Sequence, residues 1–128
     1  MNVEAIRDFC LSLPAVTEKV QWGNDLVFKI GEKMFAVLCL VEEGEVKLSF
    51  KCTPEEQAEL VEQDGIIPAP YLARHHWVGL KRFDALSQAD LKRLICNSYK
   101  LVREKLPAKV QAGLDEAPAK RKRKQTAL

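Results

Sequence analysis

The sequence predicts an α+β fold in which helices pack on one face of a mostly antiparallel sheet. Its 128 residues suffice for one hydrophobic core and are too few for two ordinary domains. Apolar segments with strand-like patterns, joined by short turns, occupy the middle of the chain, and segments with helical periodicity flank them. Helices and strands that segregate in this way are typical of the α+β class.

Three segments have the apolar spacing of amphipathic helices, and each begins at a residue suited to capping. Asn2, Thr53 and Ser87 are the expected N-caps, and a glutamate three residues after Thr53 completes a capping box. Pro14 and Pro107 mark the ends of the first and last helices, because proline cannot continue an α-helix. The expected helices cover residues 3–13, 54–64 and 88–106.

The strands are predicted from alternation and from uninterrupted apolar runs. In residues 46–52 every second side chain is apolar, so one face is expected to pack inward and the other to meet solvent. The inward set is Val46, Leu48, Phe50 and Cys52. Residues 34–41 are apolar at every position, which predicts a strand buried on both faces. Turns at residues 31–32 and 42–44 are short enough to make neighbouring strands antiparallel. Residues 20–52 are expected to form strands, with the clearest patterns at 26–30, 34–41 and 46–52, and a further strand is expected at 77–83 after a loop over 66–75.

Positive charge is concentrated at the C-terminal end. The formal net charge is +2, but residues 120–124 are five consecutive Lys and Arg, so residues 1–117 hold 15 basic and 18 acidic groups, a net of −3. We expect one domain over residues 1–111 and a basic, disordered tail over residues 112–128. Any affinity for nucleic acid must therefore come from a local patch on the folded part or from the tail.

The sequence has neither a membrane-length apolar run nor a secretory leader, and we expect a cytoplasmic protein. The cysteines form no Cys-x-x-Cys pair, and only two histidines accompany them, so no zinc-finger spacing exists. They are expected to be buried, reduced thiols, with disulfides or a metal as the alternatives. The four are Cys10, Cys39, Cys52 and Cys96.

No sequence motif of a known catalytic or cofactor site is found. Gly-x-Ser-x-Gly, the phosphate loop, His-Glu-x-x-His and Gly-x-Gly-x-x-Gly do not occur, so we expect a nonenzymatic protein with no cofactor and no metal. A Cys–His pair brought together by folding is the alternative that motifs alone leave open.

Short segments spaced along residues 5–107 occur in an order typical of one family. They are Cys10-Leu11-Ser12-Leu13-Pro14, Glu18, Val27-Phe28-Lys29, Gly31-x-Lys33-Met34-Phe35, Leu48-Ser49-Phe50-Lys51-Cys52-x-Pro54, Pro68, His76-Trp77-Val78, Ser98-Tyr99-x-Leu101-Val102 and Leu106-Pro107. Together they resemble the MmcQ/YjbR family of small bacterial proteins. The resemblance implies a fold similar to that of the frataxin-like (CyaY-like) proteins and a DNA-binding role through a double-wing arrangement of hairpins. This chain departs from the family where Ala73-Arg74-His75 replaces the frequent Asn-Lys before His-Trp, so an amide is lost and a basic charge is kept. Iron binding, which the frataxin likeness raises, is not expected, because the first helix carries only Glu4 and Asp8 beside Arg7.

Two groups of residues are candidates for nucleic-acid binding. Lys29, Lys47 and Lys51 are expected to project from the solvent face of the sheet, where a row of ammonium groups can hold phosphates. The alternative is a solvated face whose lysines discourage edge pairing. The second group combines basic and aromatic side chains suited to phosphate contact and base stacking, with Trp77 as a core anchor in the alternative reading. Its members are Arg74, His75, His76, Trp77, Lys81 and Arg82. Trp22 and Tyr99 are interpreted as core or rim residues.

These observations give two functional hypotheses. The first is a nonenzymatic DNA-binding protein that uses the basic sheet face and hairpins, with the tail adding charge. The second is an adaptor that binds a protein partner or a small ligand in a pocket beneath residues 66–77, and its motive is the acidic balance of residues 1–117.

Overall fold

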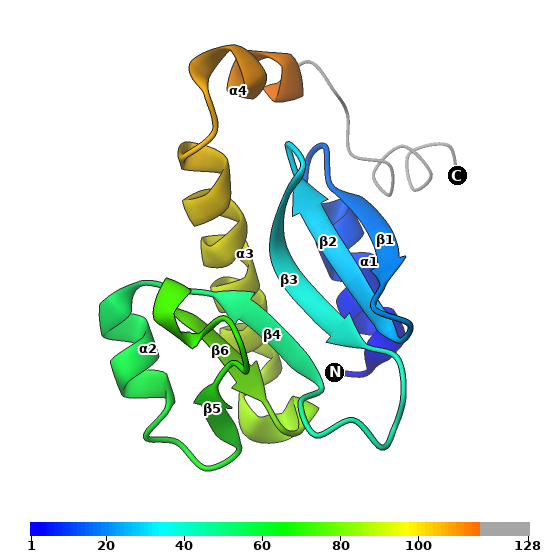
Figure 1. Ribbon diagram of the computed structural model, residues 1–128, viewed down its shortest axis with the longest axis vertical. Coiled ribbons are helices and arrows are strands. Elements are labelled where there is room, and N and C mark those ends of the chain that lie inside the picture. Colours follow the sequence, from blue (N-terminus) through cyan, green and yellow to red (C-terminus); the bar gives the residue numbers. More distant parts are fainter. Residues whose placement is uncertain (116–128) are drawn as a thin grey trace.

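The computed structural model describes residues 1–115 and shows one six-stranded antiparallel sheet backed by helices (Figure 1). The strand order across the sheet is β1-β2-β3-β4-β6-β5, and every neighbouring pair is antiparallel. The predicted α+β class is therefore confirmed. The strands are β1 (Thr17–Gln21), β2 (Asp25–Ile30), β3 (Lys33–Cys39), β4 (Leu48–Lys51), β5 (Ile66–Pro68) and β6 (Trp77–Leu80). The helices are α1 (Val3–Ser12), α2 (Pro54–Leu60), α3 (Gln88–Glu104) and α4 (Ala108–Asp115), with short 3-10 turns η1 (Ala73–His75) and η2 (Phe83–Ala85).

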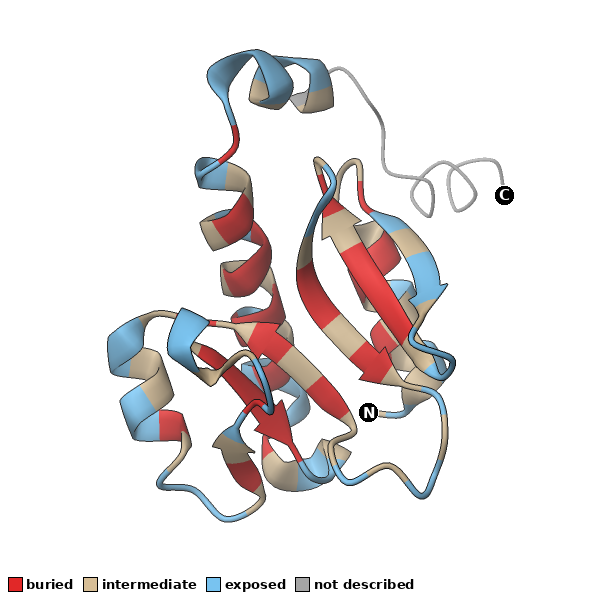
Figure 2. Ribbon diagram, viewed as in Figure 1, coloured by how far each residue is buried: buried red, intermediate tan, exposed pale blue. Residues whose placement is uncertain are grey.

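The hydrophobic core lies between the sheet and two helices, α1 and α3, which cover the same face (Figure 1). Buried residues lie along the central strands and on the sides of α1 and α3 that pack against the sheet (Figure 2). Phe28, Phe35 and Phe50 are fully buried, and the Phe35 ring meets the Tyr99 ring edge-on at a centroid distance of 5.6 Å. Each such side chain contributes about 1.5–3 kcal/mol through burial, so the phenylalanines anchor the sheet to α3.

The helix starts agree with the predicted caps. Asn2 Oδ1 accepts a hydrogen bond from the Ala5 amide at 2.8 Å, and Ser87 Oγ accepts one from the Asp90 amide at 3.1 Å. The capping box at Thr53 is complete, because its hydroxyl accepts from the Glu56 amide while the Glu56 carboxylate accepts from the Thr53 amide. Local sequence alone thus determines where α1, α2 and α3 begin.

Several strand predictions are wrong in detail. β1 is not predicted as a separate strand, and β5 lies in the segment expected to be a loop; these are the two edge strands and they bury few side chains. β3 is not buried on both faces, because Val37 and Cys39 are only half-buried on the side that no helix covers. Val46 does not point inward: the regular strand begins only at Leu48, and Val46 contacts the position of Gly79 on the helix-free face.

The end of the folded part also differs from the prediction. Pro107 does end the long helix, but a further helix, α4, follows it and runs to Asp115. Residues 112–115, expected to be disordered, therefore belong to a helix. The basic run at residues 120–124 lies outside the described residues.

All four cysteines are free thiols. Cys10 and Cys52 are buried, whereas Cys39 and Cys96 are half-buried. None of the helices within residues 1–115 combines the length and the apolar character needed to cross a membrane.

The sheet is split between β3 and β4. These strands pair over only three residue pairs, from Ala36–Phe50 to Leu38–Leu48, and then diverge (Figure 1). Where they part, the buried hydroxyl of Ser98 on α3 donates to the Phe35 carbonyl at 2.6 Å and accepts from the Lys51 amide at 3.0 Å. Ser98 thus satisfies two backbone groups that lose their strand partners at the split.

Candidate functional site

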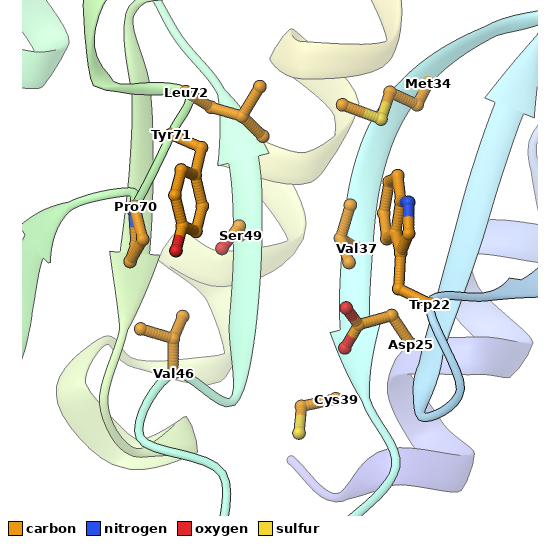
Figure 3. Close-up of a pocket in the computed structure, with 10 residues that line it drawn as sticks. All are labelled: Trp22, Asp25, Met34, Val37, Cys39, Val46, Ser49, Pro70, Tyr71 and Leu72. Atoms are coloured by element: carbon orange, nitrogen blue, oxygen red, sulfur yellow. The ribbon is translucent and has the colours of Figure 1, made fainter.

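A groove crosses the sheet face that no helix covers, which we call the open face. It has a volume of about 540 Å³ and is lined mostly by apolar side chains. Val37 of β3 and Ser49 of β4 lie on its floor, while Trp22 and Tyr71 stand on opposite sides (Figure 3). The remaining lining residues are Asp25, Met34, Cys39, Val46, Pro70 and Leu72.

The two aromatic walls come from the tips of two hairpins. Trp22 lies in the turn between β1 and β2 and is 67% exposed, and Tyr71 lies in the connection between β5 and β6 and is 99% exposed. The fold buries neither ring, although an aromatic side chain stabilises a protein mainly when it is buried. Both rings are therefore available to a ligand that enters the groove.

Both aromatic residues have left-handed backbone conformations, with φ of 52° at Trp22 and 68° at Tyr71. The Leu72 amide donates to the Ala69 carbonyl at 3.1 Å, which closes a four-residue turn with Pro70 and Tyr71 at its centre. In such a turn the third position favours glycine when its φ is positive. A bulky residue there carries strain and buries nothing, a combination that is typical of ligand-binding sites.

A carboxyl group and a hydroxyl group give the apolar groove its polar character. Asp25 begins β2 and pairs with Cys39 across the sheet, so its carboxylate lies at one end of the groove. Partial burial raises the pKa of Asp25 above its ordinary value. Ser49 places a hydroxyl on the floor, and together the two residues can accept or donate hydrogen bonds to a polar edge of a ligand.

A second cavity adjoins the groove where β3 and β4 diverge, and we call it the lysine pocket. It has a volume of about 550 Å³ and shares Met34 and Leu72 with the groove. Its cationic residues are Lys33, Lys51 and Lys105, with His75 beside them. The other lining residues are Trp77, Val102, Leu106 and Pro107.

Lys51 is fixed at the edge of this pocket. Its ammonium group donates to the His75 carbonyl at 2.8 Å, which ties β4 to η1. Partial burial lowers the pKa of Lys51, and the positive charge of Lys105 lowers it further. The two cations are therefore close enough to repel each other.

The predicted row of three lysines does not form. Lys51 borders the lysine pocket, and Lys29 lies half-buried between two core residues of β2, on the open face. Lys47 leaves this face: it lines a separate cavity with Asn2 and its ammonium group donates to the Glu42 carbonyl. Irregular backbone before β4, the same feature that turns Val46 outward, breaks the expected alternation.

The second predicted group is divided in the structure. His75 and Trp77 line the lysine pocket, although the Trp77 side chain is almost completely buried. His76 has a positive φ of 64°, and its ring lies 3.3 Å from the Gln57 amide oxygen, so it is committed to joining η1 to α2. Arg74 is exposed in η1.

Lys81 and Arg82 lie beyond the end of β6 and do not line the groove or the lysine pocket. Arg82 forms ion pairs with Asp64 at 3.2 Å and with Asp84 at 2.9 Å, so nearby carboxylates offset its charge. Lys81 is exposed.

Sequence reasoning did not identify Tyr71 and assigned Trp22 to the core or rim. The signal available for Tyr71 was its place in a proline-containing loop, because a large aromatic residue without helix or strand periodicity has no predicted packing partner. Lys33 and Lys105 were also missed, since their proximity depends on the split of the sheet. Within residues 1–115, no three His, Cys, Asp or Glu side chains gather closely enough to hold a metal ion.

The fold and the groove define a small α+β protein with a split antiparallel sheet whose open face carries an aromatic-walled groove. Residues 11–101 match the family model described as YjbR, and the chain belongs to that family. It is similar to the Deinococcus radiodurans protein DR2400, a DUF419 protein, at 27% identity and a TM-score of 0.79, over 89% of this chain and 88% of that one. A Pseudomonas syringae protein shares the fold at 21% identity and a TM-score of 0.66, over 79% of this chain and 98% of that one. A comparison with functionally curated proteins finds no match.

Proposed function

We propose that this chain is a nonenzymatic DNA-binding protein that holds single strands on its open sheet face. The observation that carries the proposal is the pair of exposed, strained aromatic residues, Trp22 and Tyr71, on two hairpin tips that flank an apolar floor. Bases stack on such rings with about 1–3 kcal/mol each, largely independent of sequence. Inside a duplex the base faces are already stacked, so this arrangement favours a single strand.

The distribution of charge supports base stacking over broad phosphate contact. Residues 1–117 carry a net charge of −3, and Arg82, Lys47 and Lys51 already bind carboxylates or backbone carbonyls. Duplex binding depends on many phosphate contacts, each made by an available cation. The lysines of the lysine pocket give the groove only a small, local cationic surface, which is better suited to a short stretch of single strand.

The direct test compares a labelled single strand of about 10 nucleotides with the duplex of the same sequence, by fluorescence anisotropy at low salt. We expect the single strand to bind more tightly and Trp22→Asn to weaken it about tenfold, which corresponds to the loss of one stacked base. Val20→Thr is the control, because Val20 is also exposed but pairs with Leu26 of β2, whose side chain belongs to the helix-covered core. Equal binding of both DNA forms, or an unchanged affinity in Trp22→Asn, would refute the role of the groove.

A second function, binding of an apolar protein segment or a small ligand, is favoured by the mostly apolar lining of the groove beneath residues 70–72. The acidic balance of residues 1–117 also supports this adaptor role. Affinity capture with the intact chain separates the two functions. If nucleic acid is captured and nuclease treatment removes it, the result supports DNA binding. If a protein is captured and stays bound after nuclease treatment, the result supports the adaptor.

A further inference from the structure

We infer that the lysine pocket is a phosphate site, and that it holds the phosphate of a nucleotide unit whose base lies between Trp22 and Tyr71. This inference rests on the proposed function and adds to it a defined orientation of the bound nucleotide. It places the base in the groove and the phosphate at the split between β3 and β4.

The geometry of the split supplies the cations. Lys33 begins β3 on one side of the gap, Lys51 ends β4 on the other, and Lys105 follows the last residue of α3. Three elements that are distant in sequence thus contribute lysines to one cavity. The hydroxyl of Ser98 bonds the Lys51 amide and the Phe35 carbonyl at this split, in place of a direct bond between the two strands.

The cations of the pocket lack a counter-charge in the described part of the chain. No Asp or Glu of residues 1–115 lines the cavity, and the ammonium groups of Lys33 and Lys105 form neither an ion pair nor a hydrogen bond with a described residue. Lys51 spends one donor on the His75 carbonyl and retains two. A phosphate between these groups would relieve their repulsion and accept several charge-assisted hydrogen bonds.

The continuity of the two cavities and the chemistry of their linings favour a nucleotide. The groove and the lysine pocket meet at Met34 and Leu72, so an elongated ligand can occupy both. The groove offers aromatic walls with Asp25 and Ser49 as hydrogen-bonding groups, which suits a planar base with polar edges. Among the described residues, the lysine pocket is lined by lysines and by no carboxylate, which suits the attached phosphate.

The test uses adenosine 5′-monophosphate, adenosine and inorganic phosphate as probes of the full chain, followed by NMR chemical shifts and tryptophan fluorescence. We expect the monophosphate to bind at least about tenfold more tightly than adenosine, because a charged hydrogen bond contributes about 1.5–3 kcal/mol. In the Lys33→Gln/Lys105→Gln variant this advantage should disappear while adenosine binds as before. Lys92→Gln/Lys100→Gln is the matched control, with the same charge change on α3 away from the pocket.

The outcomes separate this inference from the proposed function. If the single strand and the monophosphate bind but the Lys33/Lys105 variant behaves as the control does, the phosphate site is refuted and strand binding stands. If the monophosphate binds through these lysines and the strand does not, the site is supported and its ligand is a free nucleotide. The assignment is overturned if the variant and the control show the same preference for the monophosphate over adenosine. It is also overturned if inorganic phosphate still binds to the variant.

Discussion

Replacing Tyr71 with glycine should separate binding from stability. The ring is 99% exposed, so its removal costs almost no packing. A left-handed conformation costs a non-glycine residue about 1–2 kcal/mol, and glycine relieves this strain at φ 68°. Glycine also gains about 0.4–1 kcal/mol of conformational freedom in the unfolded chain, which opposes folding. We therefore expect the free energy of unfolding to stay unchanged or to rise by up to about 1.6 kcal/mol.

Binding should respond in the opposite direction. Loss of one stacking ring should weaken the single strand by about 1–3 kcal/mol, or roughly 5- to 150-fold. Urea unfolding and anisotropy titration measure the two effects, with Tyr71→Ala as the control because alanine removes the ring and keeps the strain. Tyr71→Gly should then be the more stable of the two variants and bind equally poorly. Destabilisation by more than about 1 kcal/mol would show that the ring supports the fold, and normal binding would remove Tyr71 from the site.

Three further predictions concern the rest of the domain. Ser98→Ala should lower the free energy of unfolding by about 2–4 kcal/mol in urea, because two buried backbone groups lose their partner; a loss under about 0.5 kcal/mol would contradict the bridging role. Asp25→Asn should stabilise the protein at neutral pH. Because the folded pKa is raised, this advantage should shrink as the pH falls through that pKa and vanish below the ordinary value of 3.8; a constant difference would refute it. Burial raises the pKa of Cys52 to about 12, and burial also raises the pKa of Cys10. At mildly alkaline pH a thiol reagent should therefore modify these two only after unfolding, while the half-buried pair reacts in the folded protein. Equal rates at all four thiols would contradict it.

The parts of the fold that local chemistry determines could be predicted from the sequence. The caps at Asn2, Thr53 and Ser87 locate three helices, because the side chain that starts each helix is adjacent in sequence to the amides that it satisfies. β1 and β5 could not be predicted in this way. They are short edge strands, each paired with one neighbouring strand, and they lack the apolar alternation of a half-buried strand.

The candidate site was less predictable because it depends on long-range geometry. Lys51, His75 and Trp77 were proposed from their basic and aromatic character, and they line one cavity. Their neighbours in that cavity, Lys33 and Lys105, come from other elements and meet them only because β3 and β4 separate. Alternation also failed at residues 46–47, where irregular backbone precedes β4, and no local pattern in the sequence reports such an irregularity.

The short joint between β3 and β4 makes the groove sensitive to substitutions that never touch a ligand. Trp22 belongs to the half of the sheet formed by β1, β2 and β3, and Tyr71 to the half formed by β4, β5 and β6. The two halves share three residue pairs and are held from behind by α3. The distance between the Trp22 and Tyr71 rings therefore depends on how each half of the sheet packs against α3. Conservative core changes on α3, such as Ile95→Val, should retune affinity from the opposite side of the sheet.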